Sequence, residues 1–215
     1  MIFFNLIIPN NNMIEYKFSN ITLKIRGPGD QNILSSFFDR SNYPNAIYIN
    51  GIQNQTINHT YFFNDINNTV NLIWDNPIDN CYRMFDSCIN IIEIDFSNFN
   101  TSIVTSMMMM FENCSKLYSL DLSNFKTSNV ENMHQMFSQC ILLTSLNLSS
   151  FDTSNVRDMG FMFYMCQKLS SLNVSHFNTL NVIDMTAMFD DCQQLSLLNL
   201  SNFNTSNVEN MYAML

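Results

Sequence analysis

The chain has 215 residues and a formal net charge of −9, from 9 Lys and Arg against 18 Asp and Glu. This balance argues against a nucleic-acid partner, because affinity for a phosphate backbone begins with basic charge. Only 13% of the residues are charged, so we expect solubility to depend mainly on Asn, Ser and Thr.

The amino terminus, residues 1–8, is apolar but lacks the basic start and the small-residue cleavage site of a secretory signal. No stretch approaches the ~18 to 20 apolar residues of a membrane span. We therefore expect neither a signal peptide nor a transmembrane segment in this chain.

Three strand-like stretches follow at residues 21–25, 46–49 and 70–74. Their centres and the next one, Ile94, lie about 25, 24 and 22 residues apart, close to the period of the array that follows. We interpret residues 1–79 as an amino-terminal cap of degenerate β-rich units built on the same plan, since terminal units are usually atypical. A separate small β domain ending near Trp74 is the alternative.

Residues 80–215 repeat every 26 residues, with a Met-Phe pair in each unit and a Cys three residues beyond each Phe. The pairs begin at Met84, Met110, Met136, Met162 and Met188. The chain stops at Met214-Leu215, where this register predicts another Met-Phe pair and then a Cys, so we expect it to be part of a longer protein, truncated within its last unit.

Each unit changes period midway. In the unit at 117–140, Leu120 and Leu122 alternate with polar residues, which is typical of a short half-buried strand. The second half places Val130, Met133, Met136, Phe137 and Cys140 at offsets of 3, 6, 7 and 10, which predicts a helix. Ser128 and Glu131 could form a capping box at its start.

A strand, a turn and a returning helix in every unit predict an α/β fold: a curved leucine-rich-repeat-like solenoid with one short parallel strand and one short helix per unit. The curvature is expected because paired strands lie ~4.8 Å apart, whereas packed helices need ~8 to 10 Å. The Phe column, Phe99 to Phe203, is expected to fill the turns as an aromatic spine.

The motif L-x-x-L-D-L-S-N-F-x-T-S-N-V-x-x-M-x-x-M-F-x-x-C, as it stands from Leu117 to Cys140, resembles the repeat of the BspA-type leucine-rich-repeat surface proteins. That group includes mycoplasma lipoprotein-associated and protist repeat proteins. The resemblance implies adhesion, or contact with a host or the environment, at a cell surface.

The Cys and Met columns are interpreted as core, because Cys and Met at regular inward positions behave as hydrophobes. On a helical backbone, adjacent Cys would lie outside the ~4.4 to 6.8 Å Cα range of a disulfide. His59, His134 and His176 share no partner in the sequence. We expect no metal site, no cofactor and, without any recognisable catalytic motif, no enzyme.

The outward strand positions are the candidate binding site, on a concave face. They are Asp95, Asp121, Asn147, Asn173 and Asn199, flanked by Ser119, Ser145 and Ser171. Such an array of amides and hydroxyls suits a glycan or an extended peptide. The same columns could instead hydrogen-bond along the stack and serve only the fold.

We therefore predict a non-enzymatic repeat protein for protein or glycan binding at a cell surface. The alternatives are an intracellular interaction scaffold and an inactive fragment of a larger repeat protein. We also expect self-association through an uncapped carboxy-terminal edge, where Met211 and Met214 lie.

Overall fold

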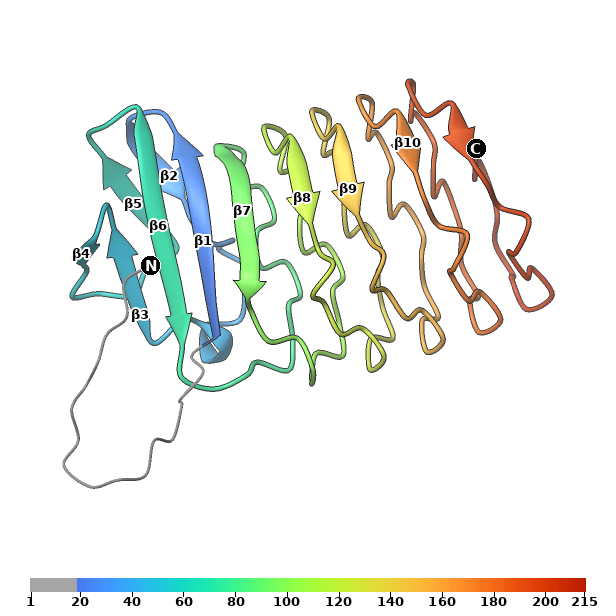
Figure 1. Cartoon of the computed structure of the whole chain (residues 1–215), viewed down its shortest axis with the longest axis horizontal. Helices are drawn as coiled ribbons and strands as arrows, with labels where there is room; N and C mark the ends of the chain where they lie inside the picture. Colours follow the sequence, from blue (N-terminus) through green and yellow to red (C-terminus); the bar gives the residue numbers. More distant parts are fainter. Residues whose placement is uncertain (1–18) are drawn as a thin grey trace.

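The computed structural model describes residues 19–215, so the apolar run at residues 1–8 lies outside the described residues. Figure 1 shows a β-rich block formed by the amino-terminal third of the chain, followed by a row of similar units that ends at the carboxy terminus. Each unit of the row presents a short strand on one side, and its Met-Phe segment runs behind it.

The amino-terminal block contains a five-stranded antiparallel sheet in the order β4-β3-β6-β1-β7. Its strands are β1 (Ser19–Arg26), β3 (Ala46–Ile49), β4 (Ile52–Gln53), β6 (Asn67–Trp74) and β7 (Ile91–Asn98). A second antiparallel pair joins β2 (Gly29–Asn32) to β5 (Thr60–Phe63). A 3-10 turn covers Arg40–Asn42.

The strand positions predicted in this block are confirmed, but their arrangement is not. β1 pairs antiparallel with β6, with Leu23 opposite Val70, and β3 pairs antiparallel with the other edge of β6. Units stacked as in the array would instead have paired parallel. The interpretation of residues 1–79 as a cap of degenerate units stays a prediction. The division at residue 79/80 stays a prediction, although the ladder described below begins at Asn80.

The repeat region pairs in parallel over very short lengths. β8 (Ser119–Asp121) pairs with β9 (Ser145–Asn147), and β10 (Ser171–Leu172) pairs with β11 (Leu197–Leu198). A column of isolated parallel bridges joins equivalent positions of neighbouring units. The column runs through Asn80, Ser106, Asn132, Asp158, Asp184 and Asn210.

The Met-Phe segment is a series of reverse turns, and residues 19–215 contain no α-helix. The Met84 N–H bonds back to the Cys81 carbonyl at 3.1 Å, whereas the Phe85 N–H bonds to the Met110 carbonyl of the next unit at 2.9 Å. Two non-glycine residues per unit adopt a positive φ, among them Met109 at 57° and Asn113 at 54°. A left-handed residue interrupts a right-handed helix.

The ring stack in the core excludes helices at this position. Phe111 and Phe137 have centroids 5.6 Å apart with nearly parallel rings, and Phe137 and Phe163 repeat that spacing. Packed helices need ~8 to 10 Å between their axes. The closer spacing is possible because alternate backbone N–H groups of each turn donate to carbonyls of the neighbouring unit, as in a β-ladder.

The predicted fold class is therefore wrong. The largest sheet is antiparallel rather than parallel, and no unit contains a helix, so the chain is not a leucine-rich-repeat solenoid. The argument for curvature fails with the helices on which it rested. The capping box at Ser128 is also absent: the N–H of Glu131 bonds to the Thr105 carbonyl of the previous unit.

The inward positions were nevertheless predicted correctly. Val130, Met133, Met136, Phe137 and Cys140 are all fully buried, in one core that extends from the block through the units. The expected aromatic spine is present as a second stack on the turn side. Its centroids are separated by 6.4 Å between Phe125 and Phe151 and by 6.5 Å between Phe151 and Phe177.

A buried Thr column links the turns. Each hydroxyl contacts both the N–H and the carbonyl of a residue 25 positions further along, in the next unit. The column comprises Thr101, Thr127, Thr153 and Thr179, all at most 2% exposed. The N–H and carbonyl groups of Lys126, Asp152, Asn178 and Asn204 thus each have a partner across the unit boundary.

Candidate functional site

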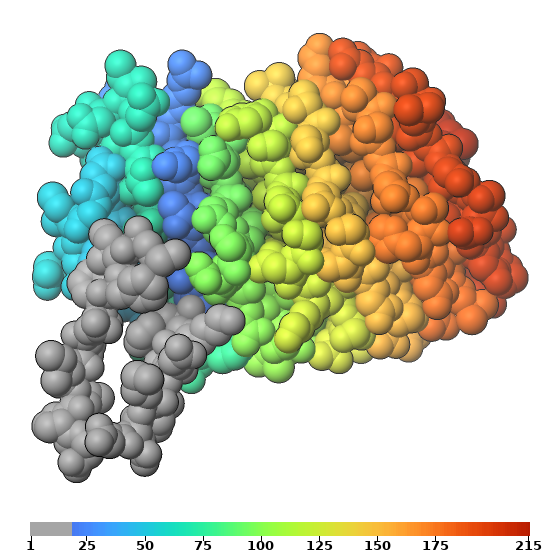
Figure 2. Space-filling view, in the orientation of Figure 1, coloured from blue at the N-terminus to red at the C-terminus, as the bar shows by residue number. Residues whose placement is uncertain are grey.

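The structure places the predicted Asp and Asn row on the outer side of the strands. Asp95 lies in β7, Asp121 in β8 and Asn147 in β9, and Asn173 and Asn199 directly follow β10 and β11. All five side chains are exposed. Figure 2 views this side of the molecule, where successive units form adjoining bands across the surface.

Each member of this row has a structural task. Its side-chain oxygen accepts a hydrogen bond from the backbone N–H of the Ser two residues later, which ends the strand in an Asx turn. The bonds measure 2.9 to 3.2 Å and start at Ser97, Ser123, Ser149, Ser175 and Ser201. This explains why only Asp and Asn occupy the row.

One contact runs along the row from unit to unit. The Nδ2 of Asn147 donates to the Oδ1 of Asp121 at 2.9 Å, as the parallel register of β8 and β9 allows. The expectation that these residues hydrogen-bond along the stack is thus met at this pair. The acidic half of the row, Asp95 and Asp121, is joined to its amide half through Asn147.

The flanking Ser row is only partly continuous. Ser119 and Ser145 lie opposite each other, but Ser171 lies opposite Leu197, whose side chain is 72% exposed. A shallow hollow at this end is lined by Ser171, Leu172, Asn173, Leu197, Leu198 and Asn199. The 26-residue register aligns Leu197 with Ser119, Ser145 and Ser171. Our prediction overlooked that this position carries Leu rather than Ser.

Tyr118 and Glu93 extend the strand face at its other end. Tyr118 is 45% exposed, and its hydroxyl lies 3.2 Å from the Oε2 of Glu93 in the preceding unit. The negative charge of Glu93 raises the pKa of the Tyr118 hydroxyl. One end of the face therefore combines the Tyr118 ring with the carboxylates of Glu93, Asp95 and Asp121. The other end presents the Asn173 and Asn199 amides beside the exposed Leu197.

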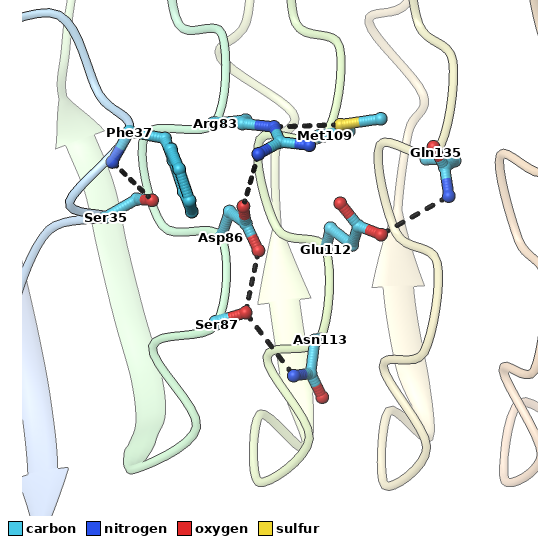
Figure 3. Close-up of polar contacts among 9 residues, drawn as sticks. All are labelled: Ser35, Phe37, Arg83, Asp86, Ser87, Met109, Glu112, Asn113 and Gln135. Carbon is cyan, nitrogen blue, oxygen red and sulfur yellow. Dashed lines mark hydrogen bonds and ion pairs between the residues drawn. The ribbon is translucent and has the colours of Figure 1, made fainter.

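The opposite side of the stack holds a separate charged cluster, drawn in Figure 3. Arg83 contacts Asp86 at 3.6 Å and directs its Nε toward the Met109 sulfur at 3.1 Å, and its guanidinium lies 4.9 Å from the Phe37 ring centroid. Burial, followed by the charge of Asp86, raises the pKa of Glu112. Arg83 and Asp86 form a structural ion pair at the boundary of the first units, whereas Glu112 accepts a hydrogen bond from the Gln135 Nε2 at 3.3 Å.

The thiol column is sealed in the core, as expected of small hydrophobic residues. The six cysteines are free, and all but Cys192 are buried. The thiols of Cys114, Cys140, Cys166 and Cys192 each donate to a Phe carbonyl of the preceding unit at 3.0 to 3.2 Å. Burial raises the pKa of Cys140 to about 12 and that of Cys192 to about 11.

Neither metal ligation nor thiolate chemistry fits this column. A nucleophile requires the thiolate, which burial disfavours by raising the pKa, and each Cys column member contacts a Phe carbonyl or apolar core rather than other metal-binding groups. Within residues 19–215, no group of three or more His, Cys, Asp or Glu side chains is placed to hold a metal ion. In the same part of the chain, no helix is long and apolar enough to cross a membrane.

A family model described as "Mycoplasma protein of unknown function, DUF285" matches residues 55–147, 79–172 and 142–215, overlapping spans that together cover most of the chain. The finer resemblance to the BspA-type proteins is not part of this match. No curated protein and no solved structure matches the chain.

Proposed function

This chain belongs to the DUF285 family of Mycoplasma proteins of unknown function, and from that premise we propose that it is a non-enzymatic repeat protein whose strand face binds a protein or glycan at a cell surface. The ligand would lie across the units, along the row from Asp95 to Asn199.

The observation that carries this proposal is that the side chains of the row use one polar atom for the fold and leave another available. One oxygen of each residue holds the Asx turn, and in every member except Asn147, whose Nδ2 donates to Asp121, a second polar group has no partner. Among residues 19–215, no partner contacts the second carboxylate oxygens of Asp95 and Asp121 or the side-chain N–H groups of Asn173 and Asn199. The fold thus fixes the position of these groups and leaves them available to a ligand, which lowers the ordering cost of binding.

The spacing of the row favours a linear ligand. Equivalent residues of paired parallel strands lie about 4.8 Å apart, and this interval applies to Asp121 with Asn147, where β8 pairs with β9, and next to Asn173 and Asn199, where β10 pairs with β11. An extended polypeptide or a sugar chain can present polar groups repeatedly along such a series. A compact small molecule would contact only one or two units.

The chemistry of the row changes along its length. Glu93, Asp95 and Asp121 make the β7–β8 end acidic, and the half-exposed Tyr118 ring adds an apolar platform there. Asn173 and Asn199 beside Leu197 make the far end neutral. We infer that a ligand would bind in one direction, with its cationic or hydroxyl-rich end near Tyr118.

The surface location rests on the likeness of the repeat to that of the BspA-type and mycoplasma lipoprotein-associated surface proteins. An intracellular interaction scaffold is the second candidate, and the six free thiols support it, since reduced Cys is usual in reducing compartments. Antibody labelling of intact cells distinguishes the two: labelling without permeabilisation supports the surface, and its absence supports the scaffold.

Binding can be tested by screening the purified protein against a glycan array and a peptide library. Asp121→Asn and Asn173→Asp are matched variants, because either side chain supplies the oxygen that holds the turn. If the row is the site, both variants should reduce the affinity for the selected ligand about tenfold, equivalent to about 1.4 kcal/mol of binding free energy. Ser128→Ala, in the turn away from the row, should leave affinity unchanged. Binding that is insensitive to both row variants would overturn the proposed site.

A further inference from the structure

The row of outward polar side chains does not begin at Asp95 but continues onto the antiparallel sheet of the amino-terminal block. Tyr48 of β3 lies opposite Asn71 of β6. Asn71 in turn lies opposite Thr22 of β1, and Thr22 lies opposite Asp95 of β7. Cross-strand partners point to the same face of a sheet, and here it is the face away from the core. Figure 1 shows β3, β6, β1 and β7 side by side in this order, followed by β8 and β9.

This continuous face carries charges of both signs. Lys24 of β1 lies opposite Glu93 of β7, and Arg26 is the next outward residue along β1. Both basic side chains are exposed, and among residues 19–215 no carboxylate lies within 4.0 Å of the Lys24 ammonium. Asp95 and Asp121 follow on the neighbouring strands β7 and β8. Two cations therefore lie beside three carboxylates across adjacent strands.

The charge pattern favours a neutral ligand. A polyanion would be attracted by Lys24 and Arg26 but repelled by the carboxylates of β7 and β8, and a polycation would meet the opposite conflict. A hydroxyl group both donates and accepts hydrogen bonds. It can therefore pair with a carboxylate, with an ammonium group, and with the Thr22 hydroxyl or the Asn71 amide between them.

Asn71 has an unmet hydrogen bond on this face. Its Oδ1 is buried and has no hydrogen-bond partner in the part of the chain that the structure describes. An unpaired buried acceptor costs about 1 to 3 kcal/mol. In the register of the sheet, Asn71 lies between Tyr48 and Thr22. A ligand hydroxyl that displaces one of these two side chains would supply the missing donor.

The aromatic rings and the length of the face suit a sugar chain. Tyr48 is partly exposed on the block and Tyr118 is 45% exposed at the first units. A sugar ring has an apolar C–H face that packs on an aromatic ring and hydroxyl groups at its edge that reach polar neighbours. The row from β3 to β7 spans about 14 Å at about 4.8 Å per strand, so several linked sugars could occupy it.

We infer that the outer face of the block and the row of the units form one site for a neutral, hydroxyl-rich glycan, with Tyr48, Asn71 and Thr22 as its contacts on the block. This inference rests on the proposed function, because it takes the strand face as the binding surface, and it narrows the ligand to one class. The glycan would run across the strands from Tyr48 through Asp95 toward Asn147.

Linear hexasaccharides of different charge test the ligand class. Cellohexaose and the N-acetylglucosamine hexamer are neutral, the glucosamine hexamer is cationic, and hexagalacturonate is anionic. By titration calorimetry at low salt, the native protein should bind a neutral hexamer with a dissociation constant below about 1 mM, at least about tenfold more tightly than either charged one. Binding of neither neutral hexamer, or tighter binding of a charged one, would overturn the inference. A peptide or charged glycan whose affinity falls in Asp121→Asn would leave the proposed function standing.

Two variants test the contacts on the block. Thr22→Val should reduce the affinity for the neutral hexamer about threefold and Asn71→Val about fivefold. Thr60→Val is the matched control, because its hydroxyl bonds to Asn32 in the other sheet, and it should leave affinity unchanged.

Stability separates binding from folding at Asn71. Asn71→Val removes an unpaired acceptor, so its free energy of unfolding should be unchanged or higher, and a decrease would overturn the assignment of Asn71 to the site. If Asp121→Asn reduces the affinity whereas Thr22→Val and Asn71→Val do not, the row remains the site and its extension onto the block is refuted. If none of the three variants reduces the affinity, both the row and its extension are refuted.

Discussion

The Thr127 hydroxyl accepts a hydrogen bond from the Asp152 N–H at 2.8 Å and donates one to the carbonyl of the same residue at 2.9 Å. One side chain thus satisfies both backbone groups of a residue in the next unit. Because Thr127 is buried, no water can replace it without rearrangement.

Thr127→Val should therefore destabilise the protein by about 1 to 2 kcal/mol, since it leaves the partly buried N–H and carbonyl of Asp152 without these partners while conserving volume. The free energy of unfolding from urea titration measures this change. Thr205→Val is the control, because Thr205 is exposed and should change stability by less than about 0.5 kcal/mol. Equal effects at the two positions would refute the role of the column.

The ring stack should dominate the stability of the units. Phe137 is fully buried and lies between Phe111 and Phe163, so Phe137→Ala should cost about 3 to 5 kcal/mol. Phe37→Ala removes a ring that is 66% exposed and contacts Arg83, and should cost less than about 1 kcal/mol. Thermal and urea unfolding of both variants would show the contrast, and similar losses would argue against the stack as the main core.

Stability should decrease with rising pH through the titration of His134. Its Nδ1 lies 3.0 Å from the Oδ1 of Asp158, and this hydrogen bond raises the pKa of His134. Burial acts in the opposite direction, and the negative charges of Asp158 and Asp184 raise the pKa further. A raised folded-state pKa contributes stability below the unfolded-state value, and that stability is lost as pH rises through the folded-state value. Glu112, Gln135 and the Phe161 ring also face this imidazole.

Urea unfolding between pH 5.5 and 9 should show this loss in the native protein and a smaller one in His134→Gln. Gly160→Ala provides an independent check, because an added Cβ would lie 3.0 Å from the His134 Nδ1 and 3.3 Å from the Asp158 Oδ1. It should displace the imidazole and reduce the same pH dependence. An unchanged pH profile in both variants would assign the effect to other groups.

The thiols should differ sharply in reactivity. Cys192 is the partly exposed member of the column, and the other five are sealed by burial. At pH 8 the native protein should react slowly with a thiol reagent at Cys192, at least about tenfold faster than at the rest. Cys192→Ser should remove this phase, and all remaining thiols should react on unfolding. Rapid reaction of several thiols in the native protein would contradict a closed core.

The sequence was sufficient for the repeat and its inward positions, because the apolar period depends only on which side chains face the core. Leu120, Phe125, Met136 and Cys140 are buried as predicted. The same period could not specify the backbone. Offsets of 3, 6, 7 and 10 suit a helix, but successive reverse turns with a left-handed residue such as Met109 satisfy them equally. Met and Gln have no preference for a positive φ, so their presence does not predict a left-handed residue.

The direction in which the first strands pair could also not be predicted from the sequence. Intervals near 25 residues between Leu23, Tyr48 and Leu72 resembled the repeat, yet β1 and β6 are antiparallel. At the candidate site, the row from Asp95 to Asn199 was correctly placed on an exposed face. The Asx turns explain its composition, and Tyr118 with Glu93 was missed because their contact joins different units.

The constant register of the columns gives the chain an unusual tolerance to changes in length. Removing the 26 residues between two equivalent points, such as Phe125 and Phe151, would rejoin the ring stacks, the Thr column and the bridges without a mismatch. Inserting a single residue at the same place would put every column out of phase at once. Gene variants of this protein should therefore differ in length by whole multiples of the repeat, with the reading frame and the fold preserved together.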